Sequence, residues 1–135
     1  MYPEAAMADD RIADPPRVLV VDDEAVVRDI VERALSLNGY WVQSADCAQA
    51  AQRILHGALF DAIVLDICMP GMDGCGLFRW MREHAPAQAS KVVFLTGSSL
   101  TGALEGFLDG TARPVMQKPF DVDDFLNTIQ AVAGR

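Results

Sequence analysis

Short apolar runs that alternate with amphipathic windows constrain the fold of this chain more than any other feature of its sequence. Most of the runs are apolar throughout, as expected for strands that are covered on both faces of a sheet. Strict alternation of strand and helix indicates right-handed βαβ units and a parallel sheet with helices on both sides. The sequence therefore predicts a doubly wound α/β fold. Its expected strands are residues 18–21, 41–44, 62–65, 92–95 and 115–117.

The windows between these runs carry the apolar spacing of helices. In the first window, Val26 and Ile30 lie on the stripe that is expected to face the core. Ser44 or Asp46 is available as the N-cap of the second helix, and Asp121 as the N-cap of the last. The expected apolar stripes cover residues 26–35, 47–55, 77–81 and 122–133.

Polar residues follow four of the expected strands directly. Asp22 and Asp23 come after the first, Asp66 after the third, Thr96 after the fourth and Lys118 after the fifth. Parallel α/β sheets bind ligands beyond the carboxyl ends of their strands, where the strand order reverses. We therefore expect these side chains to meet at one edge of the sheet.

This set of groups predicts a metal and a phosphoryl group. Three carboxylates at close range repel one another, whereas Mg²⁺ takes carboxylate oxygens as ligands and reaches phosphate oxygens. One carboxylate can then act as a nucleophile and form an aspartyl phosphate, while Lys118 neutralises phosphoryl charge and Thr96 donates a hydroxyl hydrogen bond. A cis peptide bond between Lys118 and Pro119 is expected to turn the lysine toward the site.

Four segments resemble the receiver domain of two-component response regulators, of the chemotaxis-regulator type. They are LVVDDE at 19–24, DICMPGMDG at 66–74, LTG at 95–97 and QKPF at 117–120. The resemblance implies a flavodoxin-like, five-stranded parallel sheet in the order 2-1-3-4-5. It spans residues 17–135 and leaves residues 1–16, which are rich in proline and acidic residues, as a flexible leader.

The resemblance also implies roles for single residues. Asp66 would be the phosphoacceptor, filled from the phosphohistidine of a sensor histidine kinase or of a histidine phosphotransfer protein. Asp23 would bind Mg²⁺ directly, Asp22 would act mostly through water, and the backbone carbonyl of Cys68 would be a further ligand.

Thr96 would be the switch hydroxyl and Lys118 the cation that pairs with the phosphoryl group. The protein would be a signalling switch that catalyses its own phosphorylation and dephosphorylation and passes the signal to an unknown downstream protein.

Two departures from the family pattern bear on signalling. Val115 stands where many receivers carry Tyr or Phe, and the stretch around it is similar to receivers of hybrid histidine kinases. We therefore expect the glycine-rich segment 97–110 to carry the conformational change. Cys68 and Ser98, two residues beyond Asp66 and Thr96, are expected to influence the lifetime of the phosphoryl group.

Composition excludes several other classes of protein. The net charge is −8 without any cluster of Lys or Arg, so direct binding of nucleic acid is not expected. No apolar run approaches the roughly 20 residues that span a bilayer, so no membrane contact is expected. Three cysteines without ligand spacing indicate a reducing, cytoplasmic setting and no zinc site.

Three alternatives remain open from the sequence. The chain could be a phosphate-relay receiver or a hybrid-kinase receiver excised from a larger protein. It could also be a Mg²⁺-dependent phosphohydrolase with an aspartyl-phosphate intermediate, although such enzymes place the nucleophile on the first strand. The third alternative is an interaction module that works without phosphorylation.

Overall fold

The five predicted strands form one parallel sheet. The computed structural model describes residues 14–97 and 102–134. The strand order is β2-β1-β3-β4-β5 and every pair is parallel, which confirms the predicted fold class. The strands are β1 (Arg17–Val21), β2 (Trp41–Ala45), β3 (Ala62–Asp66), β4 (Val92–Thr96) and β5 (Val115–Gln117).

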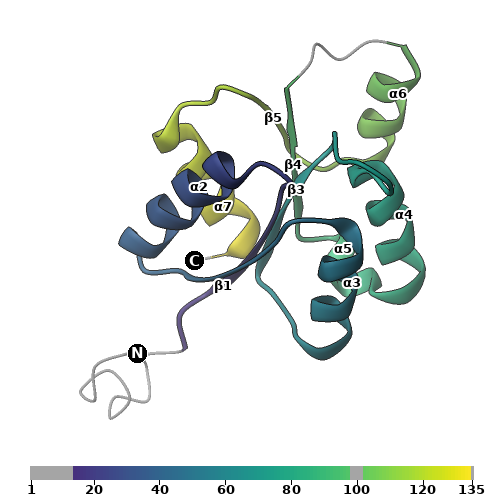
Figure 1. Ribbon diagram of the computed structural model, residues 1–135. Helices are drawn as coiled ribbons and strands as arrows, with labels where there is room; N and C mark the ends of the chain where they lie inside the picture. Colours follow the sequence, from purple (N-terminus) through teal and green to yellow (C-terminus); the bar gives the residue numbers. More distant parts are fainter. Residues whose placement is uncertain (1–13, 98–101, 135) are drawn as a thin grey trace.

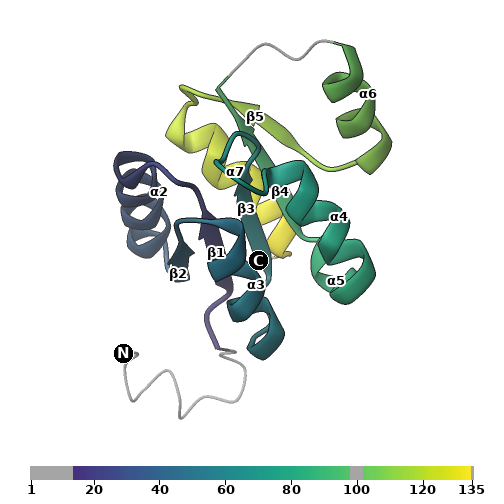
Figure 2. The same cartoon turned by 45° about the vertical axis from the view of Figure 1, so that its right-hand side comes forward.

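Helices cover both faces of this sheet (Figures 1 and 2). Two of them, α2 (Ala25–Leu37) and α7 (Val122–Ala133), lie on one face. The other face carries α3 (Ala48–Gly57), α4 (Gly74–His84), the short α5 (Pro86–Ala89) and α6 (Gly102–Thr111). The sequence did not predict α5, a single turn that begins with a proline.

Successive residues of a strand lie on opposite faces of the sheet and so belong to two separate hydrophobic cores. Ile63 and Leu65 belong to the core under α3 and α4, whereas Ala62 and Val64 belong to the core under α2 and α7. All five residues of β3 are buried. Burial on both faces is the reason that the central strands are apolar without alternation.

The helix predictions fail at three points, of which one is Val122, predicted on the apolar stripe of the last helix but 42% exposed. Val26 and Ile30 are 69% and 52% exposed, so the prediction that they lie in the core was wrong; the buried side of α2 is formed by Val31 and Leu35. The predicted cap of α3 was also wrong.

The helix α3 begins at Ala48, so its N-cap is Cys47, which makes no side-chain capping bond. Ser44 lies inside β2, and Asp46 stands one residue too early to cap. Asp121 does cap α7, because its carboxylate accepts the N–H of Asp124 at 3.0 Å.

Three further expectations concern the chain as a whole. Most of the predicted leader, residues 1–13, lies outside the described residues, so its flexibility stays a prediction. The strand β1 begins at Arg17, and the predicted domain bounds also stay a prediction. Residues 98–101, part of the glycine-rich segment 97–110 that is expected to carry the conformational change, also lie outside the described residues. Within the described ranges, no helix has both the length and the apolar character needed to span a membrane.

Candidate functional site

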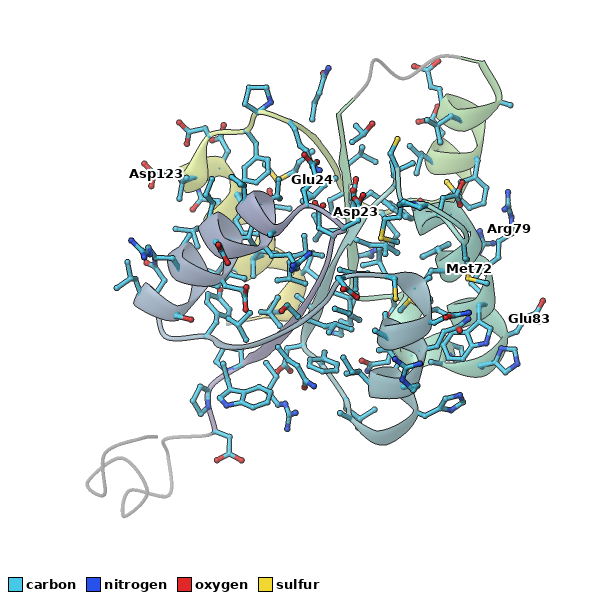
Figure 3. All side chains as sticks on the ribbon, viewed as in Figure 1. Asp23, Glu24, Met72, Arg79, Glu83 and Asp123 are labelled. Carbon is cyan, nitrogen blue, oxygen red and sulfur yellow. The ribbon has the colours of Figure 1, made fainter. Side chains whose placement is uncertain are left out.

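Carboxylates gather at the carboxyl edge of the sheet. Asp22 follows β1 and is fully buried, and Asp66 ends β3 and is 2% exposed. Asp23 and Glu24 are exposed beside them at the start of α2, where Figure 3 labels both. One oxygen from each of the four carboxylates lies within 4.8 Å of the others.

One cation, Lys118, reaches into this cluster from the end of β5. Its Nζ lies 2.9 Å from Oδ2 of Asp22, 3.1 Å from Oε1 of Glu24 and 3.5 Å from Oδ1 of Asp66. The Lys118–Pro119 peptide bond is cis, as predicted. The lysine therefore lies closer to Asp22 and Glu24 than to Asp66.

The backbone holds Asp66 in place from several sides. The N–H of Cys68 donates to Oδ1 of Asp66 at 3.3 Å. The N–H of Ile67, the residue directly after Asp66, donates to the carbonyl of Leu95. Beneath it, a Cβ on Gly74 would collide with the Asp66 carbonyl oxygen and lie 2.8 Å from the Cα of Ile67. Only glycine allows α4 to begin this close to β3.

Burial and like charge shape the protonation of this site. Burial first, and then the neighbouring charge of Asp22, raise the pKa of Asp66 to about 7. Burial opposes the charge on Lys118, but its hydrogen bonds to Asp22 and Glu24 and the charge of Asp66 outweigh that effect and raise the lysine pKa. Without a further cation, the cluster holds more negative charge than Lys118 can balance.

The structure brings the predicted site residues to one edge of the sheet. Thr96 ends β4 and is buried, one position beyond Leu95, which pairs with Asp66. The backbone N–H of Lys118 donates to the Thr96 carbonyl at 2.7 Å. Cys68, two residues after Asp66, is exposed. Ser98 lies outside the described residues.

Glu24 is a site residue that sequence reasoning missed. Its carboxylate binds Lys118, and its backbone N–H donates to Oδ1 of Asp22 at 2.9 Å. An acid in this position reads as an ordinary helix-start residue, although its place directly after Asp22 and Asp23 could have drawn attention to it.

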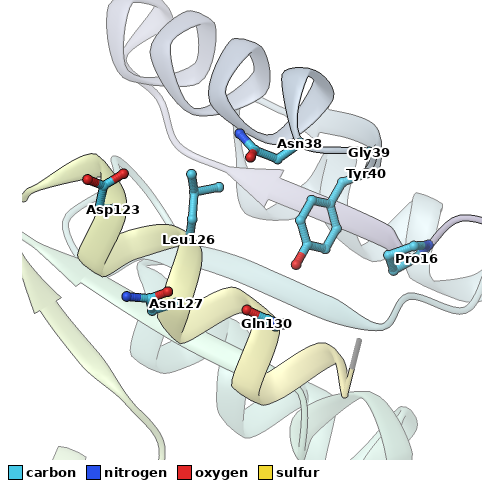
Figure 4. A pocket seen from close by; sticks show the side chains of 8 residues that line it. All are labelled: Pro16, Asn38, Gly39, Tyr40, Asp123, Leu126, Asn127 and Gln130. Atoms are coloured by element: carbon cyan, nitrogen blue, oxygen red, sulfur yellow. The ribbon is translucent and has the colours of Figure 1, made fainter.

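An apolar groove of about 320 Å³ lies beside Lys118. Val27 and Ile30 of α2 line one side of it, and Phe120 and Val122 line the other. A larger cavity of about 690 Å³ lies between Tyr40 and α7 (Figure 4). None of the predicted site residues lines this second cavity, so its size gives it no part in this chemistry.

Comparisons with known proteins point to one family. The family model for the response regulator receiver domain matches residues 18–130. Protein PetR of Rhodobacter capsulatus is 35% identical over 123 residues, which cover 91% of this chain and 51% of that protein. The chain therefore spans about half the length of the curated relatives it matches.

Solved structures show the same fold. A CheY-like response regulator receiver domain protein from Methanospirillum hungatei superposes with a TM-score of 0.80 at 24% identity, over 89% of this chain and 94% of that one. The response regulator TrrA of Thermotoga maritima, solved in complex with Mg²⁺-BeF, has a TM-score of 0.76 at 26% identity, over 87% and 98%.

Proposed function

We propose, from the premise that this chain belongs to the response regulator receiver domain family, that Asp66 accepts a phosphoryl group from a phosphohistidine of a partner protein. The carboxylate oxygen of Asp66 would attack phosphorus, the P–N bond would break, and the imidazole nitrogen would leave with the bonding electrons. The observation that carries this proposal is the meeting of Asp66, Asp22 and Lys118 at one edge of the sheet.

The donor set fits Mg²⁺. Asp22, Asp23 and Asp66 offer hard oxygen atoms within 4.8 Å of one another, and the carbonyl of Cys68 adjoins them in the chain; these are the ligands that Mg²⁺ takes in proteins. When bound, the ion would neutralise charge on the carboxylates and on the phosphoryl oxygens. The complex of the relative TrrA with Mg²⁺-BeF supports this assignment.

The other site residues would act on the phosphoryl oxygens. Lys118 is charged and already directed at Asp66, so a phosphoryl group there would gain an ion pair. Thr96 would donate its hydroxyl to a second oxygen and so move toward the site. A partner surface that reads this movement would make the protein a phosphorylation-controlled switch.

Phosphorylation of the chain by acetyl phosphate with Mg²⁺ tests the proposal directly. Intact-mass spectrometry should show the gain of one phosphoryl group, and Asp66→Asn should abolish it. Asp46→Asn, a change at an exposed acid near the same edge, should leave it unchanged. Labelling of another residue, or continuous turnover of small phosphate esters, would contradict a receiver role.

The raised pKa of Asp66 provides a second test of the proposal that the site binds a metal cation. It is about 7 in the folded protein and about 4 in the unfolded chain, so the folded state binds the extra proton. The metal-free protein should therefore lose stability as pH rises between these values. In EDTA, Asp66→Asn should unfold at higher urea than the wild type at about pH 8, but not near pH 4.

Added Mg²⁺ should raise the free energy of unfolding of the wild type at the higher pH. The Asp66→Asn variant should respond less, because it has lost one ligand and the repulsion that the ion relieves. An equal response of both proteins would argue against Asp66 as a ligand.

The apolar groove beside Lys118 gives the donor protein a place to dock. A donor must bring its imidazole to Asp66, and the groove opens beside the lysine that faces that residue. Ile30→Ser should slow transfer from a phosphohistidine protein at least tenfold and leave the rate with acetyl phosphate unchanged.

Leu37→Ser is the matched control for this test. Leu37 is a 79% exposed apolar residue on the same helix but outside the groove. Equal slowing by both variants would remove the groove from the proposal.

A further inference from the structure

A second charged cluster lies at the opposite edge of the sheet from Asp66. A cavity of about 250 Å³ opens between the end of α4, the end of α5 and the connection from α6 to β5. Arg82 and Arg113 line it together with Phe78, Ser90 and Thr111. Of the residues that the structure describes, no acidic side chain lines this cavity.

Arg113 is fixed in place but has no acidic partner. Its Nε donates to the carbonyl of Val92 at 3.0 Å. The side chain is partly buried, and burial lowers its pKa. Among the residues that the structure describes, no carboxylate pairs with it, so the N–H groups of its two terminal nitrogens are available to a ligand.

Arg82 is held by aromatic rings rather than by an acid. Its guanidinium carbon lies 4.7 Å from the ring centre of Phe78 and 5.8 Å from that of Phe107. It too has no carboxylate partner within the described ranges. Stacking on rings restricts a guanidinium while leaving its N–H groups free in the plane.

Two restrained arginines without acids call for an explanation in a chain of net charge −8. Arg113 is partly buried, and a partly buried charge destabilises a fold unless a counter-charge lies beside it. Arg82 is exposed and is restrained by its ring contacts. The nearby hydroxyls cannot share the work as donors, because Ser90 donates to the Ala87 carbonyl and Thr111 to the Leu108 carbonyl. The guanidinium groups are therefore the donors that face the cavity.

We propose that this cavity, here called the Arg82–Arg113 pocket, binds a small oxyanion of the phosphate class. Guanidinium groups pair with phosphate through parallel N–H···O bonds, and the pocket has room for such an anion. Glu83 and Asp109 stand exposed on the neighbouring helices and do not line the pocket. Figure 3 labels Glu83 where it extends outward from α4.

Binding there would join α4 to the connection between α6 and β5. The guanidinium of Arg82 already contacts the ring of Phe107 of α6, and Arg113 stands two residues before β5. The proposal does not depend on phosphorylation of Asp66, since the pocket and that residue lie at opposite ends of the strands.

NMR titration of the full chain with inorganic phosphate, at constant ionic strength and without Mg²⁺, tests the proposal. We expect saturable shifts at the Nε–H of Arg113 and at the amides of Ser90 and Thr111. Arg82→Gln should weaken binding at least tenfold. This exposed residue can be replaced without loss of the core, and the spectrum of the variant reports its folding.

Arg33→Gln, which removes an exposed arginine from α2, should bind phosphate as the wild type does. A parallel titration with methyl phosphate distinguishes the sources, because tighter binding of the ester would indicate a phosphorylated metabolite and tighter binding of phosphate the free ion. Shifts that do not saturate, that persist in Arg82→Gln or that centre on Lys118 would overturn the proposal.

Discussion

The two helices that flank β5 differ in how firmly the sheet holds them. The α6 helix precedes β5 and the α7 helix follows it, and they have 10 and 12 residues. Phe125, Ile129 and Ala133 of α7 are buried, whereas α6 buries only Leu108. Its Phe107 is partly buried and contacts α4 through Phe78 and Arg79.

The ends and the interiors of the two helices also favour α7 as the more stable one. Asp121 caps the start of α7 and Gly134 ends it at a φ of 77°. In α6, Gly106 and Gly110 interrupt the interior, and the residue after the helix, Ala112, has a φ of 57°. Segments with few buried contacts open at lower free energy, so a movement of Thr96 would pass into α6 more readily than into α7.

Truncation of one aromatic side chain in each helix should show the largest difference. Phe125→Ala should lower the free energy of unfolding by about 3–5 kcal/mol, because it leaves a cavity in the core. Phe107→Ala should lower it by about 1 kcal/mol, the worth of its ring contacts. Urea unfolding measures both free energies. Equal losses of stability would contradict the conclusion that the sheet holds α7 more firmly than α6.

Hydrogen exchange with and without beryllofluoride and Mg²⁺ tests which helix responds to the site. We expect exchange in α6 to change at least tenfold, equivalent to about 1.4 kcal/mol, while α7 stays constant. Asp66→Asn should abolish the change. Unchanged protection in α6 would contradict the expectation, taken from Val115 in place of an aromatic residue, that this segment carries the switch.

Removal of one interior glycine should stiffen α6. Gly106→Ala should raise the free energy of unfolding by about 1 kcal/mol, because the added Cβ would meet no atom within 4 Å. In α7, the reverse change Ala131→Gly should lower it by a similar amount. If Gly106→Ala has no stabilising effect, the glycines do not explain the weakness of α6.

The helix ends should give effects no larger than those of the interior glycines. Ala112→Gly should raise the free energy of unfolding by about 0.5 kcal/mol, since glycine adopts a positive φ without strain. Gly134→Ala at the end of α7 should lower it by about 1 kcal/mol. Thermal unfolding measures both changes. A loss of stability in Ala112→Gly, or a gain in Gly134→Ala, would contradict the explanation given for the helix ends.

The sequence predicted the sheet and most of the site because those signals are local. Each strand is a short apolar run, and Asp66, Thr96 and Lys118 each follow one directly. It failed for Val26 and Ile30, because an apolar stripe does not show how far a helix is rotated about its axis.

The remaining features depend on distant parts of the chain. The pairing of Lys118 with Glu24 joins residues 94 positions apart, and no local pattern marks it. The Arg82–Arg113 pocket likewise exists only because the end of α4 meets the start of β5. Arginines that look like ordinary surface residues in sequence become neighbours only after folding.

The reach of Lys118 to Asp22 spans 96 positions and ties completion of the site to synthesis of the last strand, β5. A ribosome delivers Asp66, the proposed acceptor, before it delivers the lysine. A nascent or truncated chain that stops before Lys118 therefore carries Asp66 without that cation. Under the proposed function, competence for phosphorylation would report that the whole sheet has been synthesised and folded.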